Sequence, residues 1–195
     1  MPVLGTPSRA TRDLKRHFGD RAKVGAKGER FTAEELAKLF GRDPVTWVFH
    51  DLALPRWKSA NVDHAVCRGS RVVILDTKCW APGNYWSRGD AVFRGLKRFG
   101  AAEGINLSRL SAEIAAFLGG EITVSPLVVI WPSHPGRISA RWPGASMRLP
   151  DDTPYCIGRD LGATLRRALG AGDQPSDNRV LEQLAVLTRG RRATS

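Results

Sequence analysis

The chain has 195 residues, of which 42 % are hydrophobic and 25 % are charged, as in an ordinary soluble globular protein. The 30 Lys and Arg residues against 19 Asp and Glu residues give a formal net charge of +11, which favours polyanionic partners, above all nucleic acid. A generic solubility charge is the alternative, because net charge bears on association and not on fold. We find no apolar stretch long enough to cross a bilayer and no secretion signal in residues 1–19, so we expect a cytoplasmic protein without a membrane partner.

The three cysteines exclude two further classes of protein. Cys67, Cys79 and Cys156 are odd in number and match no zinc-ligand spacing. A disulfide framework and a structural zinc site are therefore not expected, and the thiols are predicted to be reduced and close to the core.

The first half of the chain predicts an arm, a helix and three strands. Residues 1–23 are rich in Arg and Lys without sustained periodicity, which predicts a flexible basic arm. Apolar residues recur at helical spacing over 26–40, and Gly41 follows as a stop signal. Residues 45–54 are rich in β-branched and aromatic residues and predict a strand.

Two apolar runs follow, residues 62–67 and 72–77, separated by four residues that include Gly69. This pattern predicts a β-hairpin. Because apolar residues fall on both faces of both runs, the hairpin is expected to be central in the sheet and covered on both sides. Residues 80–89 contain Pro82, Gly83 and Asn84 and predict a long loop.

The second half predicts a helix over 107–118 and a strand over 122–131. Beyond these, five prolines indicate irregular structure with one strand around 138–142, a helix over 161–169 and a last helix capped by Ser176. The order of elements predicts a mixed α/β domain over 24–170, in which helices flank a central sheet, followed by a C-terminal helix and basic tail over 171–195.

The hairpin carries the first candidate chemistry. If its turn is the two residues Gly69 and Ser70, Asp63 falls directly opposite Asp76. Facing side chains of an antiparallel pair lie about 5 Å apart, and two like charges there destabilise the sheet. A divalent cation such as Mg²⁺, which prefers carboxylate oxygens, is the simplest reason for such a pair. A turn longer by one residue would shift this register.

Two further residues are expected to join the carboxylates. Lys78 lies two residues beyond Asp76, so both side chains share one face of the strand. Glu29 precedes Ala33, Leu36 and Phe40 at helical spacing and projects from the face that packs on the core. If the helix crosses the hairpin, Glu29 reaches the same ion directly or through a water molecule.

This arrangement suits hydrolysis of a phosphodiester, in which a cation polarises the phosphoryl oxygen and lowers the pKa of a bound water. Each piece alone is weak evidence, since an Asp-x-Lys tripeptide is common and strand ends often carry charges. The combination of spacings is what carries weight.

Three stretches together resemble a known family. They are Gly25-Ala-Lys-Gly-Glu29, Val62-Asp63-His64-Ala65-Val66, and Val73-Ile-Leu-Asp76-Thr-Lys78-Cys-Trp80 followed by Gly83. The chain over roughly 24–131 resembles the nuclease-related domain, NERD, of the PD-(D/E)xK nuclease superfamily. The resemblance implies a sheet of the restriction-endonuclease type and assigns Glu29, Asp63, Asp76 and Lys78 as the catalytic set. Asp76 departs from the family, which more often has Glu there, although the superfamily allows either.

Residues after the third stretch are candidates for contact with nucleic acid. Aromatic rings near a basic cleft can stack on bases, and Arg or Lys side chains can grip phosphates. Burial in the core is the alternative for the aromatic residues, and a solvated face is the alternative for the basic ones. The candidates are Trp80, Trp86, Arg88, Arg94, Lys97 and Arg98. His50, His64 and His134 have no partner at metal-binding spacing and are predicted to be structural.

The leading hypothesis is a Mg²⁺-dependent endonuclease that acts on DNA, by nicking or by full cleavage, with Mn²⁺ as a substitute ion. Asp63, Asp76 and Glu29 are its predicted metal ligands, and Lys78 is its catalytic lysine. The alternative is a nucleic-acid-binding module that keeps the fold without cutting and works in a mobile-element or defence complex. The intact acidic set favours the enzyme, and the sequence leaves a homodimer or larger complex open.

Overall fold

The computed structural model describes residues 3–6, 9–53, 61–102, 107–170 and 174–189. Its centre is a six-stranded sheet in the order β1-β2-β3-β4-β8-β12. The strands are β1 (Val3–Leu4), β2 (Trp47–Ala53), β3 (Asn61–Arg68), β4 (Arg71–Trp80), β8 (Thr123–Pro132) and β12 (Tyr155–Ile157). β2, β3 and β4 pair antiparallel, whereas β1 with β2, β4 with β8 and β8 with β12 pair parallel, so the sheet is mixed.

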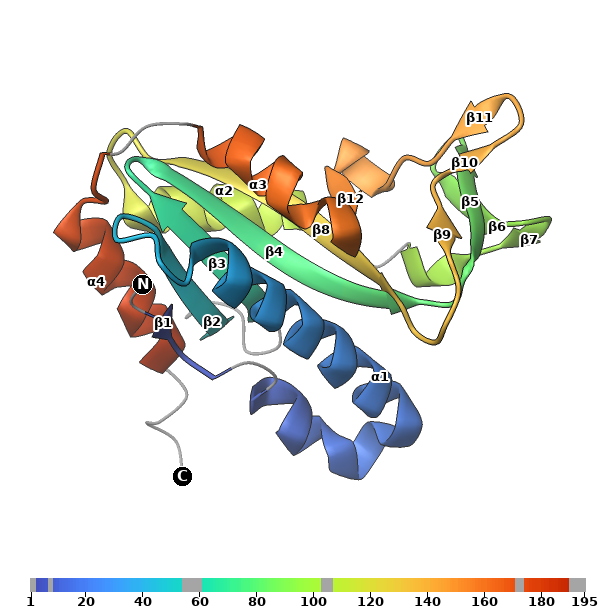
Figure 1. Cartoon of the computed structure of the whole chain (residues 1–195), viewed down its shortest axis with the longest axis horizontal. Helices are drawn as coiled ribbons and strands as arrows, with labels where there is room; N and C mark the ends of the chain where they lie inside the picture. The colour runs from blue at the N-terminus through green and yellow to red at the C-terminus, as the bar shows by residue number, and fades with distance from the viewer. Residues whose placement is uncertain (1–2, 7–8, 54–60, 103–106, 171–173, 190–195) are drawn as a thin grey trace.

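Helices cover both faces of this sheet (Figure 1). α1 (Arg9–Phe40) and α3 (Leu161–Leu169) lie on one face, and α2 (Leu107–Leu118) and α4 (Asn178–Arg189) lie on the other. The predicted fold class, a mixed central sheet flanked by helices, is therefore confirmed. None of the described helices is long and apolar enough to span a membrane.

The sheet buries apolar side chains on both faces, as the hairpin pattern predicts. On the α1 side, Leu36 and Phe40 pack against Val66 and Val73. On the α2 side, Ile114 belongs to a cluster with Ala65, Ile74 and Val128. The three cysteines are free thiols, also as predicted, with Cys67 and Cys156 buried and Cys79 half-buried.

A smaller sheet projects from one end of the large one (Figure 1). Its strand order is β7-β6-β5-β9, and a two-stranded hairpin, β10 with β11, lies beside β5. The strands are β5 (Gly83–Arg88), β6 (Ala91–Arg94), β7 (Lys97–Arg98), β9 (Ile138–Ser139), β10 (Arg141–Trp142) and β11 (Ala145–Ser146). We refer to residues 81–100 and 133–149, which form these strands and their turns, as the lobe.

The lobe corrects two expectations. The long loop predicted over 80–89 is wrong, because β4 continues to Trp80 and β5 begins at Gly83. Tyr85 is fully buried there and Trp86 pairs across the strands with Phe93, so the aromatic residues support a strand despite the turn-forming residues before them. The single strand predicted around 138–142 is two short strands, β9 and β10, in different sheets.

The N-terminal part also differs from expectation. Residues 1–23 were predicted as an arm, but Val3–Leu4 forms β1 beside β2, and α1 begins at Arg9 instead of near Ala26. Arg, Ala and Lys are strong helix formers, so α1 extends without the apolar periodicity on which the prediction relied. Residues 190–195, the predicted basic tail, lie outside the described residues, and the proposed domain boundaries stay a prediction. Three short 3₁₀ helices complete the fold, η1 (Gly100–Ala102), η2 (Pro150–Asp152) and η3 (Gly158–Asp160).

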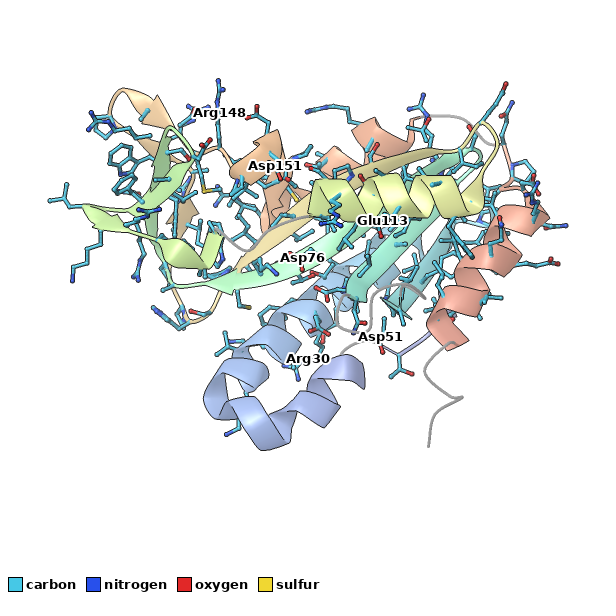
Figure 2. The ribbon with its side chains drawn as sticks, turned by 180° about the vertical axis from the view of Figure 1, so that it is seen from behind. Arg30, Asp51, Asp76, Glu113, Arg148 and Asp151 are labelled. Carbon is cyan, nitrogen blue, oxygen red and sulfur yellow. The ribbon has the colours of Figure 1, made fainter. Side chains whose placement is uncertain are left out.

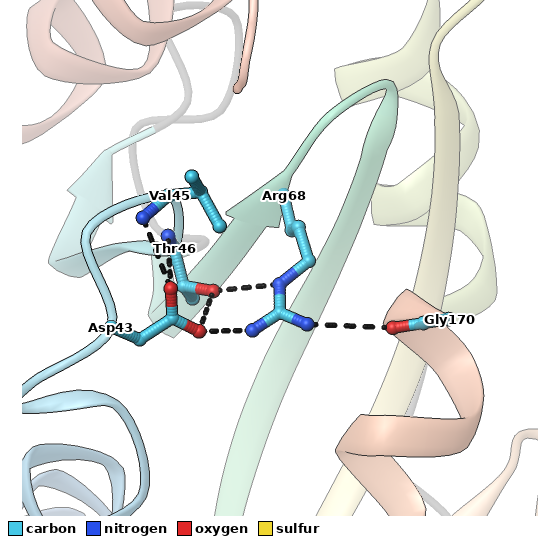
Figure 3. A network of polar contacts seen from close by, with 5 residues as sticks. All are labelled: Asp43, Val45, Thr46, Arg68 and Gly170. Atoms are coloured by element: carbon cyan, nitrogen blue, oxygen red, sulfur yellow. Dashed lines mark hydrogen bonds and ion pairs between the residues drawn. The ribbon is translucent and has the colours of Figure 1, made fainter. Parts of the chain in front are cut away.

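A polar network holds the β3–β4 turn against the rest of the domain (Figure 3). The Arg68 guanidinium forms an ion pair with Asp43 and donates to Thr46 Oγ1 at 2.8 Å and to the Gly170 carbonyl at 3.5 Å. Asp43 also accepts hydrogen bonds from the Val45 backbone N–H and the Thr46 hydroxyl. The network thereby ties the loop after α1 and the end of α3 to one hairpin.

We expect Asp43→Ala to lower the free energy of unfolding by about 2–3 kcal/mol at pH 7, because Arg68 would lose its anionic partner. Asp43→Asn keeps an oxygen that can accept the backbone hydrogen bond, so this change should lower the free energy of unfolding by only about 1 kcal/mol. Urea denaturation of the three proteins measures both values, and equal stabilities at pH 7 would contradict the role of the network.

The same network predicts a pH dependence. Burial opposes ionisation of Asp43, but its hydrogen bonds to Thr46 and Val45 and the charge of Arg68 outweigh this and lower its pKa below the ordinary 3.8. The stabilisation is therefore present above pH 3.8 and is lost as the pH falls through the lowered pKa. The difference between wild type and Asp43→Ala should shrink on acidification below that point.

Candidate active site

The β3–β4 hairpin has the two-residue turn on which the predicted register depends. Arg68 pairs with Arg71, so Gly69 and Ser70 form the turn, and Gly69 adopts a φ of +55° that glycine tolerates best. The ladder continues to His64 opposite Leu75. Asp63 and Asp76 are the next residues on the two strands beyond this last pair, and their direct pairing stays a prediction.

Asp63 reaches across to the neighbouring strand. Its Oδ2 atom accepts a hydrogen bond from the Thr77 backbone N–H at 2.6 Å. Desolvation raises the pKa of the Asp63 carboxyl well above its ordinary value, and the charges of Asp76 and Glu29 raise it further, against smaller opposing effects of Lys78 and the Thr77 N–H. Burial is thus the main cause of the shift, and the two neighbouring carboxylates add to it.

Lys78 supplies a compensating positive charge. Its Nζ atom lies 2.9 Å from Asp76 Oδ1 and 2.7 Å from Oδ2, so it bridges both oxygens of one carboxylate. Desolvation alone would lower the pKa of Lys78, but Asp76, Asp63 and Glu29 together outweigh it and raise that pKa. Lys78 is therefore a stable ammonium ion at neutral pH.

Helix α1 brings Glu29 to the same place. Thr32 Oγ1 hydrogen-bonds Thr77 Oγ1 of β4 at 3.0 Å and accepts a hydrogen bond from Trp131 Nε1 of β8 at 2.8 Å. One turn earlier, Gly28 lies so close to β4 that a Cβ atom there would stand 2.8 Å from Cys79 Sγ. Glu29 follows Gly28 directly and lines a cavity together with Asp63 and Asp76.

The four predicted catalytic residues line one cavity of about 550 Å³. Figure 2 shows Asp76 in the interior, between α1 and α2 in that view. The wall of the cavity also includes Trp80 and Ala101, the residues at which the chain enters and leaves the β5–β7 part of the lobe. Glu29, Asp63, Asp76 and Lys78 are thus brought together from α1, β3 and β4.

The cavity offers hard oxygen donors to a cation. In the part of the chain that is described, no group of three or more His, Cys, Asp or Glu side chains could hold a metal ion as it stands. Mg²⁺, however, is commonly held by one or two carboxylates and completes its octahedron with water and substrate phosphate. Asp63 and Asp76, which both line the cavity, are the residues that could hold such an ion.

A pair of buried histidines behind the site was not predicted. His50 on β2 and His64 on β3 are cross-strand partners, and their Nδ1 atoms lie 2.7 Å apart. Burial lowers the pKa of His50 to about 4, and burial together with His50 holds the pKa of His64 well below its ordinary value. Both rings are neutral at pH 7, and one ring donates a hydrogen bond to the other. This contact agrees with the structural role expected of the two residues.

The predicted nucleic-acid contacts divide into two groups. Trp80 is only 4 % exposed and packs against Tyr85 and Phe99, so it belongs to the core and offers no free ring face for a base. Trp86 is half-buried and stacks on Phe93 with ring centroids 4.7 Å apart, which leaves its role in binding a prediction. The four basic candidates are all exposed on the lobe, namely Arg88, Arg94, Lys97 and Arg98.

Comparison with family models agrees with this geometry. Residues 24–131, more than half of the chain, match the model of the nuclease-related domain. The chain belongs to the nuclease-related domain family. Neither the curated proteins nor the solved structures contain a match to it.

The NERD match includes the candidate site. It begins on α1 just before Gly25 and ends in β8, so it includes Glu29, Asp63, Asp76 and Lys78 together with strands β5 to β7 of the lobe. The helices α3 and α4 and the strands β9 to β12 lie beyond it. The NERD part alone therefore supplies every residue of the predicted catalytic set.

The close approach of α1 to β4 predicts that alanine substitutions at Gly28 and Gly25 have different effects on stability. Gly28→Ala should lower the free energy of unfolding by about 1–3 kcal/mol, because the new methyl group would overlap Cys79 Sγ and would lie 3.0 Å from Thr77 Cγ2. Gly25→Ala is the matched control, since a Cβ atom there meets nothing within 4 Å and alanine is the better helix former by up to about 1 kcal/mol. Thermal or urea unfolding measures both, and equal effects of the two changes would refute the close packing.

Proposed function

We propose that this NERD protein is a metal-dependent endonuclease that hydrolyses phosphodiester bonds of DNA. The observation that carries the proposal is the convergence of Glu29, Asp63, Asp76 and Lys78 on one cavity. Membership of a nuclease-related family supports the reaction class. The exposed basic lobe beside the cavity supports a polyanionic substrate.

Asp63 and Asp76 would hold the metal ion, Mg²⁺ or in its place Mn²⁺, and Glu29 would act directly or through a water molecule. The raised pKa of Asp63 fits this role, because a bound cation would relieve the repulsion among the carboxylates. When bound, the ion supplies Lewis-acid polarisation of the phosphoryl oxygen and lowers the pKa of a coordinated water.

Lys78 would stabilise charge on the substrate. Its ammonium group has three N–H donors and contacts the two oxygens of Asp76, so one donor remains for a phosphate oxygen. As the water oxygen attacks phosphorus, it loses a proton to the solvent, the bond to the leaving sugar oxygen breaks, and that oxygen takes up a proton from the solvent. Negative charge grows on the phosphoryl oxygens during this step, so a fixed cation there favours the transition state over the ground state.

The second candidate, a nucleic-acid-binding module that does not cut, has one observation in its favour. Lys78 already neutralises Asp76, and among the described residues no three-ligand group is assembled. All four catalytic side chains are nevertheless present in one cavity, and a module freed from catalysis has no need of them. We therefore place the enzyme first.

Substitution of the site residues tests the enzyme. A plasmid-nicking assay should show cleavage in Mg²⁺ that EDTA abolishes. Asp76→Asn and Lys78→Ala should each lower the rate by about 10²–10³-fold, as does removal of a single transition-state contact in other enzymes. Glu29→Gln should lower it by about 10–100-fold if Glu29 acts through a water molecule.

Glu34→Gln is the matched control for Glu29→Gln. Glu34 lies on the same helix but is exposed and paired with Arg30 at 3.7 Å, so its loss should leave cleavage unchanged. Cleavage that survives Asp76→Asn would refute the site assignment. DNA binding without cleavage in both Mg²⁺ and Mn²⁺ would favour the module.

The lobe makes a separate prediction about binding. If its cations contact phosphates, affinity should fall linearly on a plot of log K against log salt between about 50 and 200 mM. Arg88→Ala and Lys97→Ala should each reduce the steepness of this slope by about 0.9. Arg179→Ala is the control, because Arg179 is exposed on α4 at the opposite end of the molecule (Figure 1). An unchanged slope in both lobe variants would exclude them from the phosphate contacts.

A further inference from the structure

The turn between β6 and β7 presents an unusual side chain to solvent. Arg94 pairs with Lys97, so the turn consists of Gly95 and Leu96 alone. Leu96 is 85 % exposed, whereas the next most exposed large hydrophobic residue among those described, Val186, is 57 % exposed. Two-residue turns favour Gly, Asn and Asp, so folding gives no reason for a leucine at this position.

The turn that carries Leu96 is firmly braced. The Gly95 backbone N–H donates to the Asn84 carbonyl at 2.9 Å, and the Gly95 carbonyl accepts from Trp86 Nε1 at 2.8 Å. Trp86 is itself stacked on Phe93. An exposed apolar side chain on a fixed turn loses little conformational freedom when it enters a partner, which is the condition for a preorganised wedge.

The charge around the turn indicates the partner. The lobe contains seven Lys and Arg residues and a single acidic residue, Asp90. Arg94 and Lys97 flank the turn formed by Gly95 and Leu96, and both are exposed. A surface of this kind attracts a polyanion and repels a second copy of itself, so nucleic acid is the partner it fits.

The turn also lies within reach of the cavity. Ala101, which lines the cavity, is five residues beyond Leu96, and five residues span at most about 18 Å. Successive bases along one strand of a duplex are about 3.4 Å apart. The wall of the cavity at Ala101 and a base step met by Leu96 are therefore separated by about five base steps or fewer, and a phosphate held deeper in the cavity lies further along the duplex.

We propose that Leu96 is a wedge that inserts between stacked bases of duplex DNA close to the phosphate held in the cavity. Apolar side chains flanked by basic residues unstack base steps in this way and kink the duplex. The proposal rests on the proposed function, since it requires DNA as the ligand. Beyond that function, the wedge implies that the enzyme distorts its substrate. Flexible pyrimidine–purine steps should therefore be bound and cut more readily than stiffer steps.

A fluorescence experiment with the full chain tests the wedge. The probe is a 12-base-pair DNA duplex with 2-aminopurine in a central TA step, in low-salt buffer with EDTA to prevent cleavage. Unstacking relieves the quenching of 2-aminopurine, so saturating wild-type protein should raise its fluorescence by about threefold or more. Leu96→Ser should lose most of this rise, whereas Leu96→Met, which keeps an apolar side chain of similar size, should retain it.

Val186→Ser is the matched control, because it removes an exposed aliphatic side chain from α4, far from the lobe. It should behave as wild type, and an equal loss of signal in this variant would overturn the proposal. A full rise with Leu96→Ser would overturn it as well. So would a shift from dimer to monomer on gel filtration of Leu96→Ser, which would make Leu96 an interface residue.

Anisotropy of a dye-labelled copy of the same duplex separates the wedge from the proposed function. Wild-type protein that binds without any rise in 2-aminopurine fluorescence would overturn the wedge and leave the endonuclease proposal intact. Wild-type protein that does not bind the duplex would overturn both. Support requires that Leu96→Ser still binds, with an affinity within about tenfold of wild type, while the fluorescence rise is lost.

Discussion

The site depends on how α1 is fixed to β4. The hydroxyls of Thr32 and Thr77 are buried and bonded to one another, and the Trp131 indole N–H completes the group. A rotation or slide of α1 would leave these polar groups without partners, at a cost of about 1–3 kcal/mol for each. The absence of a side chain at Gly28 allows the close approach, and the hydroxyl pair fixes its register. Glu29 is thereby presented to a cavity whose other acidic residues come from a hairpin remote in sequence.

Much of this arrangement could be predicted because it rests on short-range rules. A two-residue turn leaves one antiparallel register, so Asp63 and Asp76 come to the same end of the β3–β4 ladder as soon as Gly69 and Ser70 are identified. The helix over 107–118 was predictable because its apolar residues follow a single period. Periodicity placed Glu29 on the inner face of its helix but could not show where the helix crosses the sheet, since Thr32 and Thr77 are 45 residues apart.

Other features depend on pairings that no local pattern encodes. The contact of His50 with His64 follows from the register between β2 and β3, which are joined by residues 54–60, too many to fix a register by turn type. β5 was mistaken for a loop because Pro82, Gly83 and Asn84 are turn formers, yet Gly83 pairs with Ile138, a residue far along the chain. The burial of Trp80 depends on its contacts with Tyr85 and Phe99, which no local pattern in the sequence predicts.

The attachment of the lobe has a consequence for how such proteins diversify. Trp80 and Pro132, where the chain passes into the lobe from β4 and from β8, are register partners in parallel strands, and Ser133 N–H donates to the Trp80 carbonyl at 2.8 Å. The chain therefore enters the lobe from β4 and from β8 at the same end of these two strands. Insertions or deletions beyond this end can lengthen, shorten or recharge the lobe while the six-stranded sheet keeps its register. The shape and charge of the lobe can thus change without a change in the cavity that Asp63, Asp76 and Lys78 line.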